Sequence, residues 1–87
     1  MSHIFTFLLA IGVRKRKRLP HQRIIGENIR QQRKRVGWSQ EKLAEKADLH
    51  PVYFGQVERG EQVISVHALV RVAKALKVKL TDLVARI

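Results

Sequence analysis

The chain has 87 residues, which is enough for one small domain and too few for two. Apolar residues make up 45% of it, so it can form a core and does not have the composition of a disordered polybasic peptide. It contains no cysteine, which excludes disulfides and thiolate zinc sites.

The charge indicates a polyanionic partner. There are 18 Lys and Arg against 7 Asp and Glu, for a net charge of +11. Six of the basic residues and none of the acidic ones fall among residues 1–23, so this segment and the remainder are both basic. Charge alone leaves nucleic acid, ribosome and anionic membrane open as partners.

Residues 1–23 are predicted to form an N-terminal apolar and basic arm, disordered or loosely helical. Residues 4–13 are apolar but far shorter than the roughly 20 residues that a membrane-spanning helix needs. The basic run RKRKR follows them, whereas a signal peptide places its basic residues first. Three interpretations stay open: a tail from a wrongly assigned start codon, an arm that touches phosphates, or a membrane-surface anchor. Pro20 then separates the arm from a domain at 24–87.

Residues 24–36 are predicted to form the first helix of that domain. Ile25, Ile29 and Val36 make a sparse apolar stripe, and basic residues cover the rest of the surface. Trp38, in the link that follows, is expected to pack on the core beside the second helix.

Residues 39–60, SQEKLAEKADLHPVYFGQVERG, predict two short helices joined by a sharp break. Ser39 is an N-cap for a helix at about 40–47, and Leu43 and Ala47 lie on one face of it. Pro51 suits the first position of a second helix at 51–59, because that position needs no backbone N–H. On this second helix Phe54 and Val57 are expected to face the core.

This stretch resembles the helix-turn-helix of the Cro/phage-repressor family, also called the xenobiotic-response-element type. The residues that match are Gln40, Leu43, Ala44, Leu49, Phe54, Val57, Glu58 and Gly60. The resemblance extends over about residues 25–84 and implies an all-α, lambda-repressor-like bundle of about five short helices. The helix-turn-helix itself then lies at about 40–59, and helix 51–59 is the recognition helix.

The resemblance also suggests the roles of individual residues. DNA bases are expected to be contacted by Pro51, Val52 and Gln56, of which Gln56 can pair with adenine and Val52 can touch a thymine methyl. DNA phosphates are expected to be contacted by Gln40, His50, Tyr53 and Arg59. Arg33 and Glu58 are implied to form a structural ion pair between the first helix and the recognition helix.

Two residues in the turn depart from the family pattern. Family members commonly carry glycine where this chain has Asp48, at a position of positive φ that aspartate tolerates at modest cost. His50 stands where Ser or Thr usually caps the recognition helix, so either His50 is a weaker cap or Asp48 replaces it.

The C-terminal part predicts two more helices. Ser65 caps a helix at 66–76 whose buried face is expected to hold Val66, Leu69, Val70, Ala73 and Leu76. Thr81 is expected to cap a last short helix at 82–86. Leu83, Val84 and Ile87 are predicted to complete the core or to form a two-fold interface.

Together these features predict a sequence-specific transcriptional regulator that binds double-stranded DNA as a homodimer, in the cytoplasm and at the nucleoid. The alternative is a protein-interaction module such as an antitoxin or a restriction-modification controller, with a toxin or another regulator as partner. We expect no enzyme activity and no cofactor, because paired carboxylates, phosphate-binding glycine loops and catalytic triads are missing. No metal is expected, since the four histidines lack ligand spacing.

Overall fold

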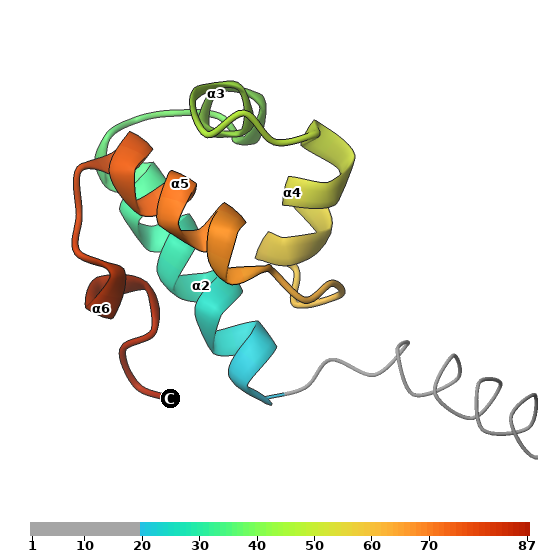
Figure 1. Ribbon diagram of the computed structural model, residues 1–87, viewed down its shortest axis with the longest axis vertical. Coiled ribbons are helices and arrows are strands. Elements are labelled where there is room, and N and C mark those ends of the chain that lie inside the picture. The colour runs from blue at the N-terminus through green and yellow to red at the C-terminus, as the bar shows by residue number, and fades with distance from the viewer. Residues whose placement is uncertain (1–19) are drawn as a thin grey trace, which may run out of the picture.

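The computed structural model describes residues 20–87, which form five helices and no strand (Figure 1). They are α2 (Pro20–Arg35), α3 (Gln40–Lys46), α4 (Pro51–Glu58), α5 (Val66–Leu76) and α6 (Leu80–Leu83). The all-α bundle predicted from the sequence is confirmed. The interpretations of residues 1–19 lie outside the described residues.

The first helix starts earlier than predicted, at Pro20 rather than at residue 24. Pro20 therefore opens α2 instead of separating an arm from it, because proline costs nothing where no backbone N–H is needed. The helix ends at Arg35, and Gly37 reverses the chain with φ of +73°. Val36 was expected in the apolar stripe, but it lies beyond the last turn and is 45% exposed.

Serine caps start α3 and α5 as predicted. The Ser39 hydroxyl accepts a hydrogen bond from the Lys42 amide at 3.0 Å, and the Ser65 hydroxyl accepts one from the Ala68 amide at 3.1 Å. Each cap satisfies one of the N–H groups that a helix start leaves without an intrahelical acceptor.

The last helix differs from the prediction in both cap and extent. It runs over Leu80–Leu83 with Lys79, not Thr81, at its N-cap. The Asp82 carboxylate reaches back to accept a hydrogen bond from the Lys79 amide at 3.0 Å. A charged acceptor at the third helical position fixes the helix start more strongly than a neutral hydroxyl does.

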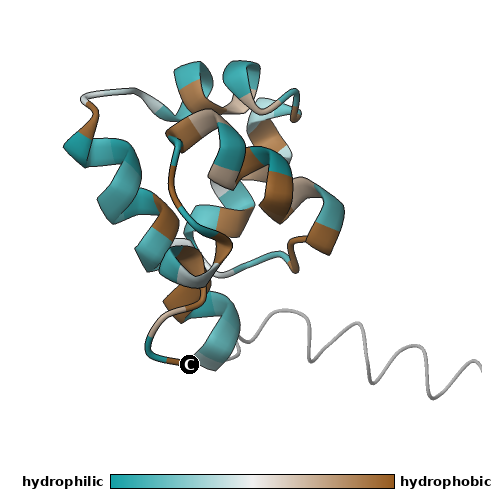
Figure 2. Ribbon diagram, turned by 60° about the vertical axis from the view of Figure 1, so that its left-hand side comes forward, coloured by the Kyte–Doolittle hydropathy of each residue, from teal (hydrophilic) through white to brown (hydrophobic). Residues whose placement is uncertain are grey.

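The core lies between α2, α3, α4 and α5, and α6 packs against α2 and α5 (Figures 1 and 2). Its buried apolar residues are Ile29, Leu43, Ala44, Ala47, Phe54, Val57, Leu69, Val72, Ala73, Leu76 and Leu83. Trp38 packs half-buried against this cluster, as expected.

The buried face of α5 is rotated relative to the prediction. Leu69, Ala73 and Leu76 are buried as expected, but Ala68 and Val72 complete the face. Val66 is 72% exposed, because it occupies the free first turn of α5 and points away from the core. Val70 is only half-buried.

Two glycines bring α2 against the end of α4. A Cβ added at Gly26 would lie 2.5 Å from the carbonyl oxygen of Val57, so only glycine fits between the helices. Gly60 has φ of +74°, and a Cβ there would lie 3.0 Å from the Cα of Arg23. The N-terminal half of α2 is therefore in close contact with the C-terminal end of α4.

Asn28 fastens the C-terminal residues to α2. Its buried amide nitrogen donates to the carbonyl oxygens of Leu83 at 3.0 Å and Ala85 at 2.8 Å. Its side-chain oxygen accepts a hydrogen bond from the Arg86 guanidinium at 2.6 Å. All hydrogen-bonding groups of this buried amide are thus used, which removes the cost of burying it.

Within residues 20–87, no helix combines the length and the apolar composition required to cross a membrane.

Candidate nucleic-acid interface

The turn between α3 and α4 has the backbone that the sequence predicted. Asp48 adopts φ of +57°, in the left-handed region where family members usually place glycine. The following residue, Leu49, packs half-buried against the core. The turn thereby fixes the angle between α3 and α4.

His50, not Asp48, caps the recognition helix. Its backbone is extended, and its Nδ1 accepts a hydrogen bond from the Val52 amide at 3.2 Å. Of the two alternatives that the sequence left open, the structure selects the histidine. The ring nitrogen accepts the backbone hydrogen bond that a Ser or Thr hydroxyl accepts at most helix N-caps.

The α4 helix presents its first turn to solvent and its opposite face to the core. Phe54 and Val57 are fully buried, which confirms the predicted inward face. Pro51 is exposed, Val52 is 61% exposed, and Gln56 follows one turn later, half-buried. The three residues expected to contact bases therefore lie outside the core, on or beside the exposed first turn.

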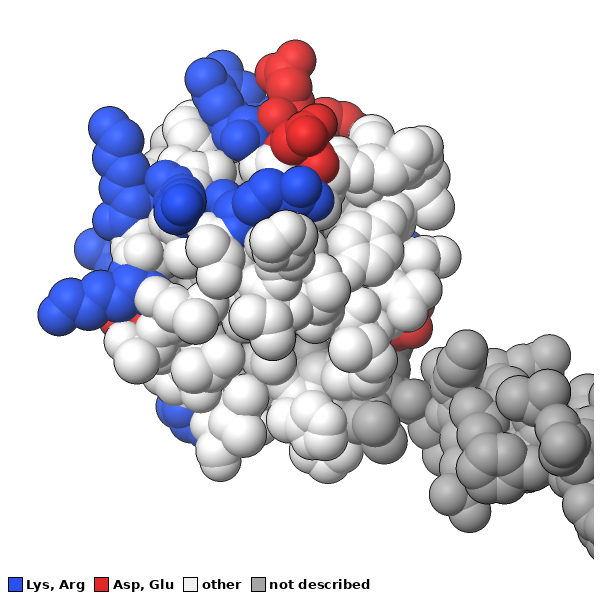
Figure 3. Space-filling view, in the orientation of Figure 1, with Lys and Arg blue, Asp and Glu red and all other residues white. Residues whose placement is uncertain are grey.

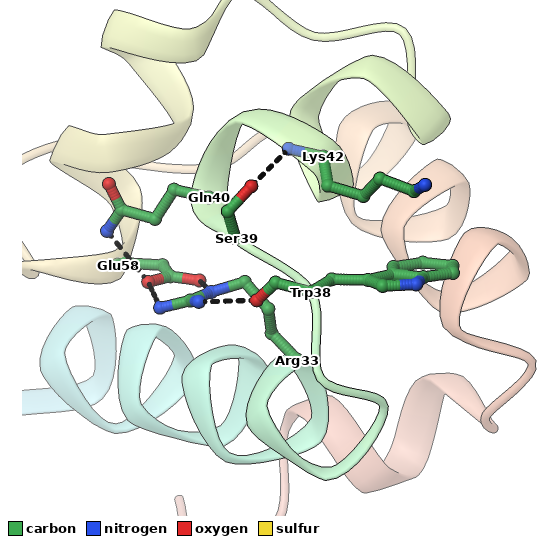
Figure 4. Close-up of polar contacts among 6 residues, drawn as sticks. All are labelled: Arg33, Trp38, Ser39, Gln40, Lys42 and Glu58. Atoms are coloured by element: carbon green, nitrogen blue, oxygen red, sulfur yellow. Dashed lines mark hydrogen bonds and ion pairs between the residues drawn. The ribbon is translucent and has the colours of Figure 1, made fainter.

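Glu58 is the centre of a hydrogen-bond cluster behind this surface (Figure 4). Arg33 donates to both carboxylate oxygens, from Nε to Oε2 at 2.7 Å and from Nη2 to Oε1 at 2.9 Å. Its Nη1 also donates to the carbonyl oxygen of Trp38 at 2.8 Å. The structure thus brings together the two residues that the resemblance pairs, and it ties α2 to both α3 and α4.

Gln40 joins the same cluster. Its Nε2 donates to Oε1 of Glu58 at 2.9 Å, as Figure 4 shows. This bond fixes the amide group, so that its oxygen is placed near α4, 3.4 Å from where a Cβ on Gly55 would lie. The sequence had assigned Gln40 to a phosphate and had not foreseen its bond to Glu58.

Gly55, on α4, is buried. The guanidinium of Arg59 and the amide oxygen of Gln40 lie over it, and Nη1 of Arg59 is 3.2 Å from the position of an added Cβ. Because Gly55 has no side chain, it leaves room for two side chains of the predicted phosphate set to pack against α4.

The remaining two residues of that set have partners in the loop after α4. Nε of Arg59 lies 3.1 Å from Oε1 of Glu61, and the arginine side chain is still 51% exposed. The Tyr53 hydroxyl donates to the carbonyl oxygen of Val63 at 3.1 Å and accepts from the Ser65 amide at 3.3 Å. The tyrosine hydroxyl is thus hydrogen-bonded as both donor and acceptor to the segment between α4 and α5.

A polar hollow of about 460 Å³ opens beside this cluster, between α2 and the end of α4. Its lining residues are Arg23, Glu27, Arg30, Arg33, Gln40, Glu58 and Arg59. No role was predicted for Arg23, Glu27 or Arg30, but in α2, which begins at Pro20, their spacing places them on one face of the helix. In the part of the chain that the structure describes, no group of three or more His, Cys, Asp or Glu is placed to hold a metal ion.

This arrangement of α3, turn and α4 matches a known family. A family model described as helix-turn-helix matches residues 29–83. The chain belongs to the helix-turn-helix family. It is a DNA-binding regulator of the Cro/repressor type.

Two curated relatives are control proteins. The chain is 41% identical over 63 residues to control protein C.SmaI of Serratia marcescens, covering 72% of this chain and 75% of that one. It is 39% identical over 61 residues to control protein C.BamHI of Bacillus amyloliquefaciens, covering 69% of this chain and 75% of that one.

Solved structures of helix-turn-helix regulators have the same fold. The restriction-modification controller protein C.AhdI from Aeromonas hydrophila aligns with a TM-score of 0.70 and 34% identity, over 71% of this chain and 94% of that one. The hypothetical transcription factor NHTF from Neisseria aligns with a TM-score of 0.72 and 31% identity, over 78% of each chain. The clp gene regulator ClgR from C. glutamicum aligns with a TM-score of 0.70 and 28% identity, over 75% of this chain and 84% of that one.

Proposed function

We propose that this protein is a homodimeric transcriptional controller of a restriction-modification system, acting in the cytoplasm on an operator of that locus. The observation that supports this most directly is the similarity to restriction-modification controller C.AhdI, which extends over 94% of that chain. The two control proteins among the curated relatives support the same class of regulator.

The α4 helix is the element that enters the major groove. Its eight residues make a helix of about 12 Å, comparable with the roughly 12 Å width of that groove. The exposed Val52 is suited to a thymine methyl, and Pro51 beside it offers a second apolar contact. Gln56 has the amide that can pair with the N6 and N7 edge of adenine.

Phosphates on either side of the groove are contacted by Gln40, His50 and Arg59. Arg59 is half-exposed at the end of α4, and His50 is exposed at its start. Gln40 presents an amide already held by Glu58. Tyr53 remains in the proposed set only if its hydroxyl exchanges the Val63 carbonyl for a phosphate oxygen.

A second copy of the chain covers the uncharged surface near the start of α5. Val63 and Val66 are 61% and 72% exposed there, and the C-terminal Ile87 is 63% exposed. In Figure 3, basic side chains gather at the upper left, while most of the centre and lower part of the face crossed by α5 carries no charged side chain. Such apolar exposure in a small domain favours self-association.

Selection of binding sites from a random duplex pool tests the proposal. We expect a palindrome whose half-sites are about one turn, roughly 34 Å, apart. The same site should occur upstream of a methyltransferase or endonuclease gene in the source genome. Recovery of no common sequence at low salt would contradict operator binding, and a single non-repeated half-site would contradict the dimer.

Sedimentation of Val66→Asp tests the dimer surface separately. The charged side chain should shift the protein from dimer to monomer, because a carboxylate at an apolar interface loses its hydration. Val36→Asp is the matched control, since Val36 is also an exposed valine but follows α2 instead of opening α5. If both variants sediment like the wild type, this surface is not the dimer interface.

A further inference from the structure

The hollow between α2 and α4 contains more positive charge than its internal ion pair uses. Arg33 and Glu58 neutralise each other there through two short hydrogen bonds. The lining that remains carries three arginines, Arg23, Arg30 and Arg59, against the single carboxylate of Glu27. The hollow therefore has a net positive charge and lies beside the proposed DNA surface.

The fold holds these cations together through close backbone packing. Arg23, Glu27 and Arg30 follow one another at i, i+4 and i+7, so they share one face of α2. Gly26 and Gly60 let that face approach the end of α4 more closely than any other residue type would allow. As a result, Arg23 and Arg30 line the same space as Arg59, the residue that follows α4.

Within the described part of the chain, neither Arg23 nor Arg30 has a carboxylate partner. Among the ion pairs formed within residues 20–87, one joins Arg33 to Glu58 and the other joins Arg59 to Glu61, and neither includes Arg23 or Arg30. Both side chains are exposed, so their guanidinium groups are free to bind an anion. Guanidinium groups form paired, charge-assisted hydrogen bonds to phosphate oxygens in particular.

A second hollow lies next to the first one along α2. It has a volume of about 280 Å³ and is lined by Glu27, Arg30, Gln31 and Lys34. The two hollows share Glu27 and Arg30, so a basic row of Arg23, Arg30 and Lys34 runs along the helix. A row of adjacent sites fits a chain of phosphates better than it fits a single free anion.

We propose that the α2 track, defined as Arg23, Arg30 and Lys34, binds backbone phosphates of the DNA that flanks the groove occupied by α4. This deepens the proposed function and rests on it for the identity of the polymer. Arg59, at the C-terminal end of α4, lies in the same hollow and links the track to the groove. The track enlarges the footprint on DNA without adding base contacts, so it raises affinity for every sequence alike.

The salt dependence of DNA binding by the full chain tests the track. Arg23→Gln and Arg30→Gln are each expected to weaken binding about fivefold, on the selected operator and on an unrelated duplex equally. Each should also lower the slope of log K against log salt by about 0.9, the value for one lost phosphate contact. Arg35→Gln is the matched control on the same helix, because Arg35 lines neither hollow and its Nη1 donates to the Gln32 side-chain oxygen at 3.4 Å.

A gain of affinity provides a test that misfolding cannot imitate. Glu27→Gln removes the one carboxylate that faces a bound phosphate in both hollows and is expected to tighten duplex binding about twofold or more. Unchanged or weaker binding by Glu27→Gln, together with unchanged slopes for the two arginine variants, would overturn the proposal.

Titration with inorganic phosphate, at constant ionic strength and without DNA, separates the two sources of phosphate. NMR chemical shifts of backbone amides in α2 and at Gly60 should change with phosphate concentration and reach a plateau. If these changes are lost in Arg30→Gln, they support a phosphate site in the hollow even if the wild type bound no duplex. In that case the proposed function would fail and the site would stand. If phosphate binds in this way but the DNA slopes of both arginine variants match the wild type, the assignment to DNA is overturned.

Discussion

The guanidinium of Arg33 and the carboxylate of Glu58 meet in parallel, with N–O distances of 2.7 and 2.9 Å. Their side chains are only 11% and 1% exposed, so this pair is largely shielded from water. It connects the last turn of α2 to the last residue of α4, and Glu58 also accepts a hydrogen bond from Gln40. The orientation of the recognition helix therefore depends on a charge pair as well as on the apolar core.

Removing one partner of this pair should cost much more than removing both. Glu58→Leu leaves the Arg33 charge without its acceptor and should lower the free energy of unfolding by roughly 3 kcal/mol. The double variant Arg33→Leu, Glu58→Leu should lose clearly less than the sum of the two single variants. Urea denaturation of the four proteins gives the coupling energy. Strict additivity would show that the pair contributes nothing as a pair.

Gln56 and Arg59 should affect DNA binding in different ways. Gln56→Ala should reduce the preference for the operator over its base-substituted forms, by about 1–3 kcal/mol at the adenine that it contacts. Arg59→Ala should weaken binding to operator and random duplex equally and lower the salt slope by about 0.9. Competition binding at several salt concentrations measures both quantities. An equal loss on specific and random DNA for Gln56→Ala would remove the base contact assigned to it.

Gly55→Ala should separate stability from affinity. Alanine favours an α-helix over glycine by roughly 0.5–1 kcal/mol, and its Cβ meets no backbone atom, only the ends of the Arg59 and Gln40 side chains. The melting temperature should therefore rise. DNA binding should weaken, because the added Cβ displaces both side chains from their positions over residue 55. Thermal unfolding and duplex titration of the same sample check this. A variant that is stabilised and binds DNA with unchanged affinity would mean that the packing of Arg59 and Gln40 on Gly55 has no role in binding.

Tyr53→Phe decides between the two roles of that residue. The hydroxyl bridges Val63 and Ser65, so its loss should cost about 1 kcal/mol of stability through the loop before α5. The salt slope of DNA binding should stay unchanged. A slope lower by about 0.9 would instead establish the phosphate contact that the sequence predicted.

Local signals in the sequence were sufficient for most of the fold. Ser39 and Ser65 start their helices because a cap depends only on the residues next to it. Phe54 and Val57 are buried because their spacing defines a helix face whatever packs against it. Asp48 at positive φ followed from the resemblance alone.

The contacts that the sequence did not indicate join residues that lie far apart along the chain. Nothing near Gly55 indicates that Gln40 will lie over it, since Gln40 belongs to another helix. In the sequence Asn28 is one polar residue of a helix among several, and it is buried because the C-terminal segment packs on it. The hollow beside Arg23 and Arg30 likewise depends on how closely α2 and α4 approach, which spacing along one helix does not specify.

The bonds from Asn28 to the last residues also have a consequence for folding during synthesis. Its partners Leu83 and Arg86 lie 55 and 58 positions further along the chain. Until those residues have left the ribosome, the Asn28 amide can be satisfied only by water, and the first helix cannot take its final place in the core. We therefore expect nascent chains that stop short of Leu83 to remain sensitive to protease, and resistance to appear abruptly once residue 86 has emerged.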